Sequence, residues 1–246
     1  MYRFLLTRRW ITAGLVVLAA VVTMIGLGLW QLRRHDEVRT RNDLVVRRLS
    51  EPVVPAGEAF RSGPAVATYR RVALEGTYDV SAEVAIDNRS SEGRPGRHLL
   101  TPLRPAQGPA LIVDRGWIPL DIYASAAAPE EGRVTVVGVL FPSERKGGLE
   151  PAIAPTGTLE QFPRIDVARI GQQLAYPSYP LYLRLESQAP GQQGGLPQRP
   201  GLPLFSNGPH LSYAVQWFLF TTVAVAVFAA LARKEARKRA RVASSG

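Results

Sequence analysis

The chain has three histidines, His35, His98 and His210, and these are its most versatile ligands for a metal or a prosthetic group. No two of them have the sequence spacing of a local metal pair, and the chain contains no cysteine. Its two methionines, Met1 and Met24, cannot supply the soft ligands that a copper chaperone needs. We therefore expect no disulfide, no zinc-thiolate or iron–sulfur centre, and no metal site built from protein ligands.

Sequence motifs of common catalytic sites are also missing. There is no nucleophile elbow, no zinc-protease helix motif, no phosphate-binding loop, and no dinucleotide fingerprint between a strand and a helix. Gly26 and Gly28 lie within an apolar run, where close contact between helices explains them better. We expect that the protein is not an enzyme, and we assign no catalytic residue.

Aromatic, amide and cationic side chains gather at two places far apart in the sequence. His210, Tyr213 and Trp217 share one helix face, and Trp30 shares another with Arg34. Rings and an imidazole suit the plane of a flat apolar ligand, and a guanidinium suits its carboxylates. The candidate ligand contacts are His210, Trp30, Gln31, Arg34, Tyr213, Gln216 and Trp217.

Simpler roles exist for the same residues. Tryptophan, tyrosine and arginine commonly anchor helices at a membrane interface. The glutamines Gln31 and Gln216 could hydrogen-bond between two helices, and His210 could be a solvated helix cap.

Two apolar runs must position these side chains. Residues 10–30 and residues 211–232 carry no charge, and about 21 helical residues reach roughly 31 Å, enough to cross a hydrocarbon core of about 30 Å. Backbone polar groups find no partner in lipid, so a helix is required. An antiparallel pair of such helices brings residue 30 and residue 210 to the same membrane face. For the first run, a cleaved signal peptide and a mitochondrial presequence are the alternatives.

The net charge of +10 lies mainly at the two ends: residues 1–9 contribute +3 and residues 233–241 contribute +5. A nucleic-acid-binding face would spread its basic groups among aromatic ones, so we expect no nucleic-acid partner. The positive-inside rule instead places both termini in the cytoplasm, although several arginines follow the first run. The expected location is the plasma membrane of a bacterium, crossed twice and in contact with lipid.

The region between the spans is long enough for one domain. Strands are predicted at short apolar segments separated by turn residues, a helix is predicted over 166–174 with Asp166 as its N-cap, and the first span is expected to continue as a helix through residue 50. The predicted strands are residues 71–80, 83–88, 99–103, 110–117, 134–141 and 180–185.

The predicted fold class is therefore membrane α+β, with two transmembrane helices bracketing a β-rich extracytoplasmic barrel or sandwich. Its parts are a cytoplasmic N-terminus (1–9), a first transmembrane helix (10–32), the β-rich domain with its juxtamembrane helix (33–187), a Pro/Gly-rich connector (188–209), a second transmembrane helix (210–232) and a basic cytoplasmic tail (233–246).

Three ordered stretches resemble the signatures of the surfeit locus protein 1 family. They are Gly28-x-Trp30-Gln31-Leu32-x-Arg34, Val113-Asp114-Arg115-Gly116-Trp117-Ile118-Pro119, and the stretch from Asn207 to Trp217. Weaker matches lie at residues 69–78 and 101–103. The chain departs from the family in having Asp114 in place of Asn, Val38 in place of Lys, and no second Asn near Gly208.

The resemblance implies an assembly factor for cytochrome c oxidase that helps subunit I acquire or retain haem a, held transiently. It makes His210 the candidate haem contact and assigns Arg115, Gly116 and Trp117 to a structural motif. Subunit I, and other oxidase or supercomplex subunits, are the implied partners. The alternative is an accessory subunit of the mature oxidase or supercomplex that binds no cofactor.

The second signature also has a purely structural interpretation. Asp114 and Arg115 would form an ion pair at a strand end, and Gly116 would allow a tight bend beneath which Trp117 packs.

Overall fold

The computed structural model describes residues 3–122, 127–148, 150–192, 194–202 and 206–244. The chain divides into two compact units. One unit contains residues 1–44 and 205–246, and the other contains residues 45–204.

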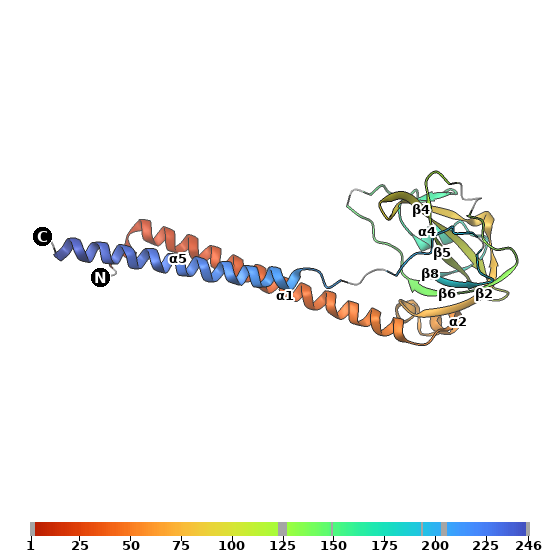
Figure 1. Cartoon of the computed structure of the whole chain (residues 1–246), viewed down its shortest axis with the longest axis horizontal. Helices are drawn as coiled ribbons and strands as arrows, with labels where there is room; N and C mark the ends of the chain where they lie inside the picture. The colour runs from red at the N-terminus through yellow and green to blue at the C-terminus, as the bar shows by residue number, and fades with distance from the viewer. Residues whose placement is uncertain (1–2, 123–126, 149, 193, 203–205, 245–246) are drawn as a thin grey trace. The chain divides into compact units, whose positions relative to one another are not determined.

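The first unit is a helical hairpin. A short 3-10 helix, η1 (Arg3–Leu6), precedes α1 (Arg8–Ser50), and α5 (His210–Ser244) lies beside α1 in Figure 1. Between residues 10 and 42 of α1, buried or half-buried positions recur at alternating intervals of four and three (10, 14, 17, 21, 24, 28, 31, 35, 38 and 42), with residues 27 and 32 half-buried beside this stripe. This is the spacing of coiled-coil packing, and it aligns one stripe of α1 with the partner helix.

Both long helices are long and apolar enough to cross a membrane. As predicted, the first helix continues without a break through residue 50. Gly28 allows the two helices to approach closely, because a Cβ at this position would lie 2.8 Å from the ring of Phe218. Trp10 contacts Phe228 edge-on at the other end of the pair, with ring centroids 6.0 Å apart.

The second unit is a β-barrel (Figure 1). Its main strands are β2 (Arg71–Tyr78), β3 (Val84–Ser91), β4 (Arg94–Arg104), β5 (Ala110–Pro119), β6 (Arg133–Phe141) and β8 (Ser178–Ala189). Strands β2, β6, β8, β5 and β4 are hydrogen-bonded in that order, and the barrel closes where Thr77 and Tyr78 of β2 pair with β4. Strand β3 extends the sheet beyond β4.

Short elements complete this unit. They are β1 (Val54–Pro55), α2 (Ala56–Ala59), η2 (Phe60–Ser62), α3 (Pro64–Ala67), η3 (Val80–Ala82), β7 (Gln161–Phe162) and α4 (Val167–Gly171). The sequence analysis missed the short helices of residues 56–67, because four-residue helices leave no periodic pattern.

The barrel core explains why β5 is so apolar. All ten residues of β5 are buried, since the strand pairs with β4 on one side and, in parallel, with β8 on the other. The described residues of the domain form three apolar clusters: one includes Leu103 and Leu111, the second includes Ile112 and Phe162, and a smaller third includes Leu99.

Most predicted strands are confirmed, with different ends. The strand predicted over 180–185 runs to Ala189, so the connector expected from residue 188 begins later. The helix predicted over 166–174 ends at Gly171, although its N-cap is correct because Asp166 accepts a hydrogen bond from the Arg169 amide. Gly171 has the low helix propensity that favours an early end.

Candidate functional site

The first and third signatures meet through one hydrogen bond. The Nδ1 atom of His210, at the first turn of α5, lies 2.8 Å from Oε1 of Gln31 on α1. Because an amide oxygen is only an acceptor, this contact selects the imidazole tautomer that carries its proton on Nδ1. The Nε2 lone pair is then available to a ligand, which is the arrangement of a metal-binding histidine oriented by a second hydrogen bond.

A second polar contact holds the same end of the hairpin. The amide nitrogen of Asn42, buried on α1, donates to the Ser206 carbonyl and to Oδ1 of Asn207. These contacts hold the chain just before His210. Two residues of α1 therefore position the histidine: Gln31 contacts its ring, and Asn42 holds the segment that precedes it. Sequence analysis did not identify Asn42, because a polar residue on a charged juxtamembrane helix gives no distinctive signal.

The remaining predicted site residues of α1 do not face this hydrogen bond. Trp30 is 55% exposed, and Arg34 forms an ion pair with Glu37 along the same helix at 3.0 Å. Trp30 therefore presents its ring outward from the helix pair, where a ligand or lipid can reach it.

On α5, the predicted residues differ in burial. Tyr213 is 49% exposed and Gln216 is exposed, whereas Trp217 is half-buried and contacts the Phe220 ring edge-on. The structure thus joins Gln31 and His210 by a hydrogen bond, and it leaves the rings of Trp30 and Tyr213 exposed on the same two helices. Of the two predicted interhelical glutamines, Gln31 makes the hydrogen bond, while Gln216 lies on the open surface of α5.

The second signature lies inside the barrel. Arg115 is fully buried on β5 and donates to Oε2 of Glu83 at 2.8 Å, and also to the Ala127 carbonyl. The same Glu83 oxygen accepts a hydrogen bond from Thr101 at 2.5 Å. The expected ion pair between Asp114 and Arg115 is wrong, because neighbouring side chains of a strand point to opposite faces.

Asp114 instead belongs to a separate buried cluster. Its carboxylate lies 2.9 Å from Nδ1 of His98, on β4, and 3.8 Å from Nε of Arg184, on β8. The partners His98 and Arg184 thus compensate the charge of a fully buried acid. Nothing in the sequence pointed to His98 or Arg184, since strand pairing brings them together from distant segments.

Gly116 and Trp117 shape the middle of β5 rather than a strand end. Gly116 has φ of +134°, and its missing Cβ leaves room for the carbonyl of Gln198. Trp117 exchanges two backbone hydrogen bonds with Gln198, each 2.8 Å long, and its ring packs against Gly96. The strand continues through these residues with a register shift against β4, and the contacts with Gln198 attach the connector to the barrel.

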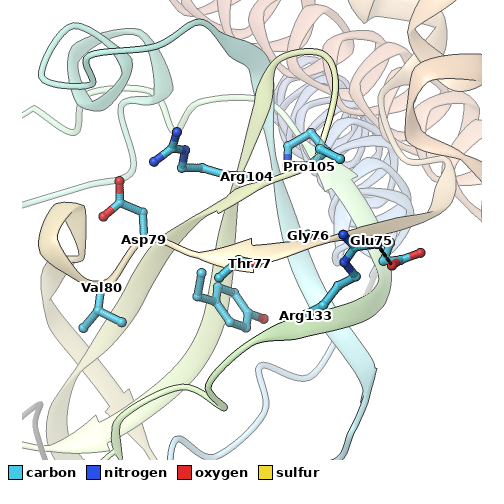
Figure 2. A pocket seen from close by; sticks show the side chains of 10 residues that line it. Glu75, Gly76, Thr77, Asp79, Val80, Arg104, Pro105 and Arg133 are labelled. Atoms are coloured by element: carbon cyan, nitrogen blue, oxygen red, sulfur yellow. Dashed lines mark hydrogen bonds and ion pairs between the residues drawn. The ribbon is translucent and has the colours of Figure 1, made fainter.

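A polar hollow of about 460 Å³ opens beside the barrel closure (Figure 2). Two pairs of opposite charge flank it: Glu75 with Arg133, 3.1 Å apart, and Asp79 with Arg104. The Tyr176 hydroxyl donates to Asp79 at 2.7 Å, and the Arg104 guanidinium lies 4.5 Å from the centre of the Tyr176 ring. The charges are satisfied within the domain, and none of the predicted site residues lies here.

Several described side chains of the hairpin have the chemistry to bind a ligand. Among the described residues, no group of three histidine or acidic side chains could hold a metal ion. His210 can offer one oriented nitrogen, and the exposed rings of Trp30 and Tyr213 can contact a flat apolar surface.

Comparison with known proteins identifies a family whose model covers all three signatures. The SURF1 family model matches residues 18–222, which include all three signatures. An uncharacterised SURF1-like protein of Mycobacterium bovis is 29% identical over 97% of this chain and 89% of its own length. A SURF1-like protein of Rickettsia felis is 26% identical over 83% of this chain and 90% of its own.

A vertebrate relative matches a shorter part of the chain. Surfeit locus protein 1 of Takifugu rubripes is 29% identical over 52% of this chain and 61% of its own length. Because the family model covers the chain from the first apolar helix to the second, the chain belongs to the SURF1 family.

Proposed function

We propose that this protein is a membrane-anchored assembly factor for cytochrome c oxidase that helps subunit I acquire or retain haem a. The SURF1 family is known generally for cytochrome c oxidase assembly. The observation that carries the proposal is the hydrogen bond between Gln31 and His210, which unites two family signatures from opposite ends of the chain.

In this proposal, α1 and α5 cross the plasma membrane as an antiparallel pair. Both termini lie in the cytoplasm, where the basic groups of residues 1–9 and 233–241 are favoured, and the barrel lies outside. The exposed apolar side chains of both helices, such as Leu15 and Val223, support this placement because lipid is their favourable environment.

The types of side chain at the polar end of the hairpin suit a haem that binds against the exposed surface of the two helices. His210 would hold the iron through Nε2, because Nδ1 is engaged by Gln31. Trp30, Tyr213, Gln216 and Trp217 would contact the macrocycle, and Arg34 would pair with a propionate. Haem, when bound, supplies an iron centre with a characteristic Soret absorption, and the protein holds and releases it without a chemical step of its own.

Purification of the full chain from membranes that make haem a tests this function. We expect a Soret band in the unaltered protein that is lost in His210→Ala, with the helix content unchanged. A His98→Ala variant is the matched control, because it removes an imidazole from the barrel and should leave the band intact.

The accessory-subunit alternative gives a different result. Stoichiometric retention in active oxidase, with no haem in the purified chain, would contradict the assembly proposal. So would full-height haem a bands in reduced-minus-oxidised spectra of membranes from a strain that lacks the protein.

A further inference from the structure

The opposite end of the hairpin carries a groove that the proposed haem site does not use. It has a volume of about 1010 Å³ and is formed by the start of α1 and the second half of α5. Its floor is apolar and includes Trp10, Phe228 and Leu231. Its rim carries six basic side chains: Arg9, Arg233, Lys234, Arg237, Lys238 and Arg241.

Glu235, the one acidic residue among those that line the groove, can offset only one of these six positive charges. Glu235 accepts a hydrogen bond from Arg239 at 2.7 Å, and the Arg239 guanidinium lies 4.9 Å from the centre of the Phe4 ring. Phe4 in turn contacts Trp10 edge-on, with ring centroids 5.1 Å apart. Through Phe4, η1 thus contacts both Trp10, which lines the groove, and Arg239 of α5.

From this arrangement we infer that the groove binds an anionic glycerophospholipid. The apolar floor suits acyl chains, and the basic rim suits a phosphodiester headgroup that has no compensating cation. A nucleic acid would pair with the basic side chains but would leave the apolar floor of the groove uncovered. A neutral lipid would cover the apolar floor but would leave the basic side chains without an anionic partner. The apolar floor and the basic rim occur together where the apolar part of α5 is followed by its basic part. In a membrane-spanning helix, this transition lies at the level of the membrane surface.

This inference rests on the proposed membrane hairpin but not on haem binding. The two ends of the pair are separate, since Gln31 lies 22 residues from Arg9 along α1 and His210 lies 23 residues from Arg233 along α5. A chain that binds no haem can therefore still bind the lipid, and the two proposals fail independently.

Trp10 provides a direct measurement, because it lies in the groove. The full chain in detergent, with Trp30→Phe and Trp217→Phe, retains Trp10 and the 5% exposed Trp117. Phosphatidylglycerol and phosphatidylcholine with brominated acyl chains are titrated separately, and quenching of Trp10 fluorescence is followed. We expect phosphatidylglycerol to bind about tenfold more tightly, because each basic residue near an anionic lipid favours binding by roughly fivefold.

The charge variant is Lys234→Gln with Arg237→Gln, which should reduce the preference several-fold while leaving phosphatidylcholine quenching unchanged. Its matched control is Arg39→Gln with Arg41→Gln, which removes two exposed charges from the other end of the hairpin and should keep the preference. Millimolar inorganic phosphate is added in a third titration, and it should not displace the lipid.

Three results would overturn the inference. They are equal binding of the two lipids by the starting protein, an unchanged preference in the Lys234 and Arg237 variant, and complete displacement by inorganic phosphate. The last of these would show a phosphate site rather than a lipid site. Circular dichroism of each variant verifies that the helices remain folded.

Discussion

His210 and Gln31 are 179 positions apart and yet share a hydrogen bond of 2.8 Å. The contact fixes the register of α1 against α5, because a shift by one turn would separate the two side chains by about 5.4 Å. Together with the contact between Trp10 and Phe228, it shows that the two helices run antiparallel.

Substitution of Gln31 tests whether this orientation matters for haem. Gln31→Leu removes the acceptor for Nδ1–H, so the imidazole is free to rotate or to change tautomer. Loss of such an orienting partner typically weakens metal binding by about 10–100-fold, and we expect a weakening of that size in a haem titration followed at the Soret band.

Two variants make this result specific to Gln31. Gln31→Glu keeps an acceptor and should restore most of the affinity, whereas Gln172→Leu removes an exposed amide from the barrel and should change nothing. Equal affinities for the Leu and Glu variants would show that Gln31 acts only through helix packing.

Close packing at Gly28 gives a prediction about the stability of the hairpin. In Gly28→Val the new side chain would collide with Phe218, and we expect a loss of about 1–3 kcal/mol, as is usual for an overpacked contact. Thermal unfolding in detergent, followed by circular dichroism, measures the loss.

Gly26 is the matched control, because no atom lies within 4 Å of the place a Cβ would occupy. Gly26→Val should therefore be close to neutral. Adding Phe218→Leu to Gly28→Val should recover part of the stability, and a Gly26 effect as large as that of Gly28 would argue against close packing as the cause.

Sequence patterns predicted the parts of this fold that depend on local order. The length and apolarity of the two helices, the alternation of Val72 and Leu74 in β2, and the cap at Asp166 are all visible in short windows. Barrel closure was not visible, because the pairing of Thr77 with Arg104 depends on the register of every strand between them.

Sequence patterns likewise predicted only those parts of the candidate site that depend on local order. Helical spacing placed His210 and Trp217 on one face, and an antiparallel arrangement of helices brought Gln31 to the correct depth. Spacing could not show that Trp30 turns outward, since that depends on the rotation of α1 about its axis. The partners of Asp114 were hidden because they come from β4 and β8.

Arg115 and Glu83 provide a test of the buried signature. Removal of one partner from a buried ion pair leaves an uncompensated charge and commonly lowers the free energy of unfolding by about 3–5 kcal/mol. We expect Arg115→Ala to show a loss of this size in thermal unfolding of the full chain.

Arg133→Ala is the control for Arg115, because it breaks the exposed pair with Glu75, whose side chains are 69% and 55% exposed. Such pairs contribute about 0–1 kcal/mol. Similar losses for the two variants would mean that burial does not govern the strength of these ion pairs. Replacing both Arg115 and Glu83 by apolar residues should be milder than Arg115→Ala alone.

The polar hollow of Figure 2 predicts a pH dependence. Partial burial raises the pKa of Asp79, but hydrogen bonds from Ser81 and Tyr176 and the charge of Arg104 more than offset it, so its pKa is lowered overall. A carboxyl whose pKa is lower in the folded state stabilises the fold above its unfolded pKa, and this contribution is lost as the pH falls through the folded value.

Tyr176→Phe should therefore destabilise the protein at neutral pH and progressively less in acid. We expect a difference of about 0.5 kcal/mol at pH 7, because solvent weakens the hydrogen bond of a partly exposed carboxylate. Urea unfolding of both proteins at several pH values between neutral and about 3 measures this difference.

Tyr179→Phe serves as the control, because the Tyr179 ring stacks on Phe60 with centroids 4.0 Å apart, and its effect should not vary with pH. A gap between Tyr176→Phe and the unaltered protein that stays constant down to pH 3 would show that the Tyr176 hydroxyl does not stabilise the ionised form of Asp79.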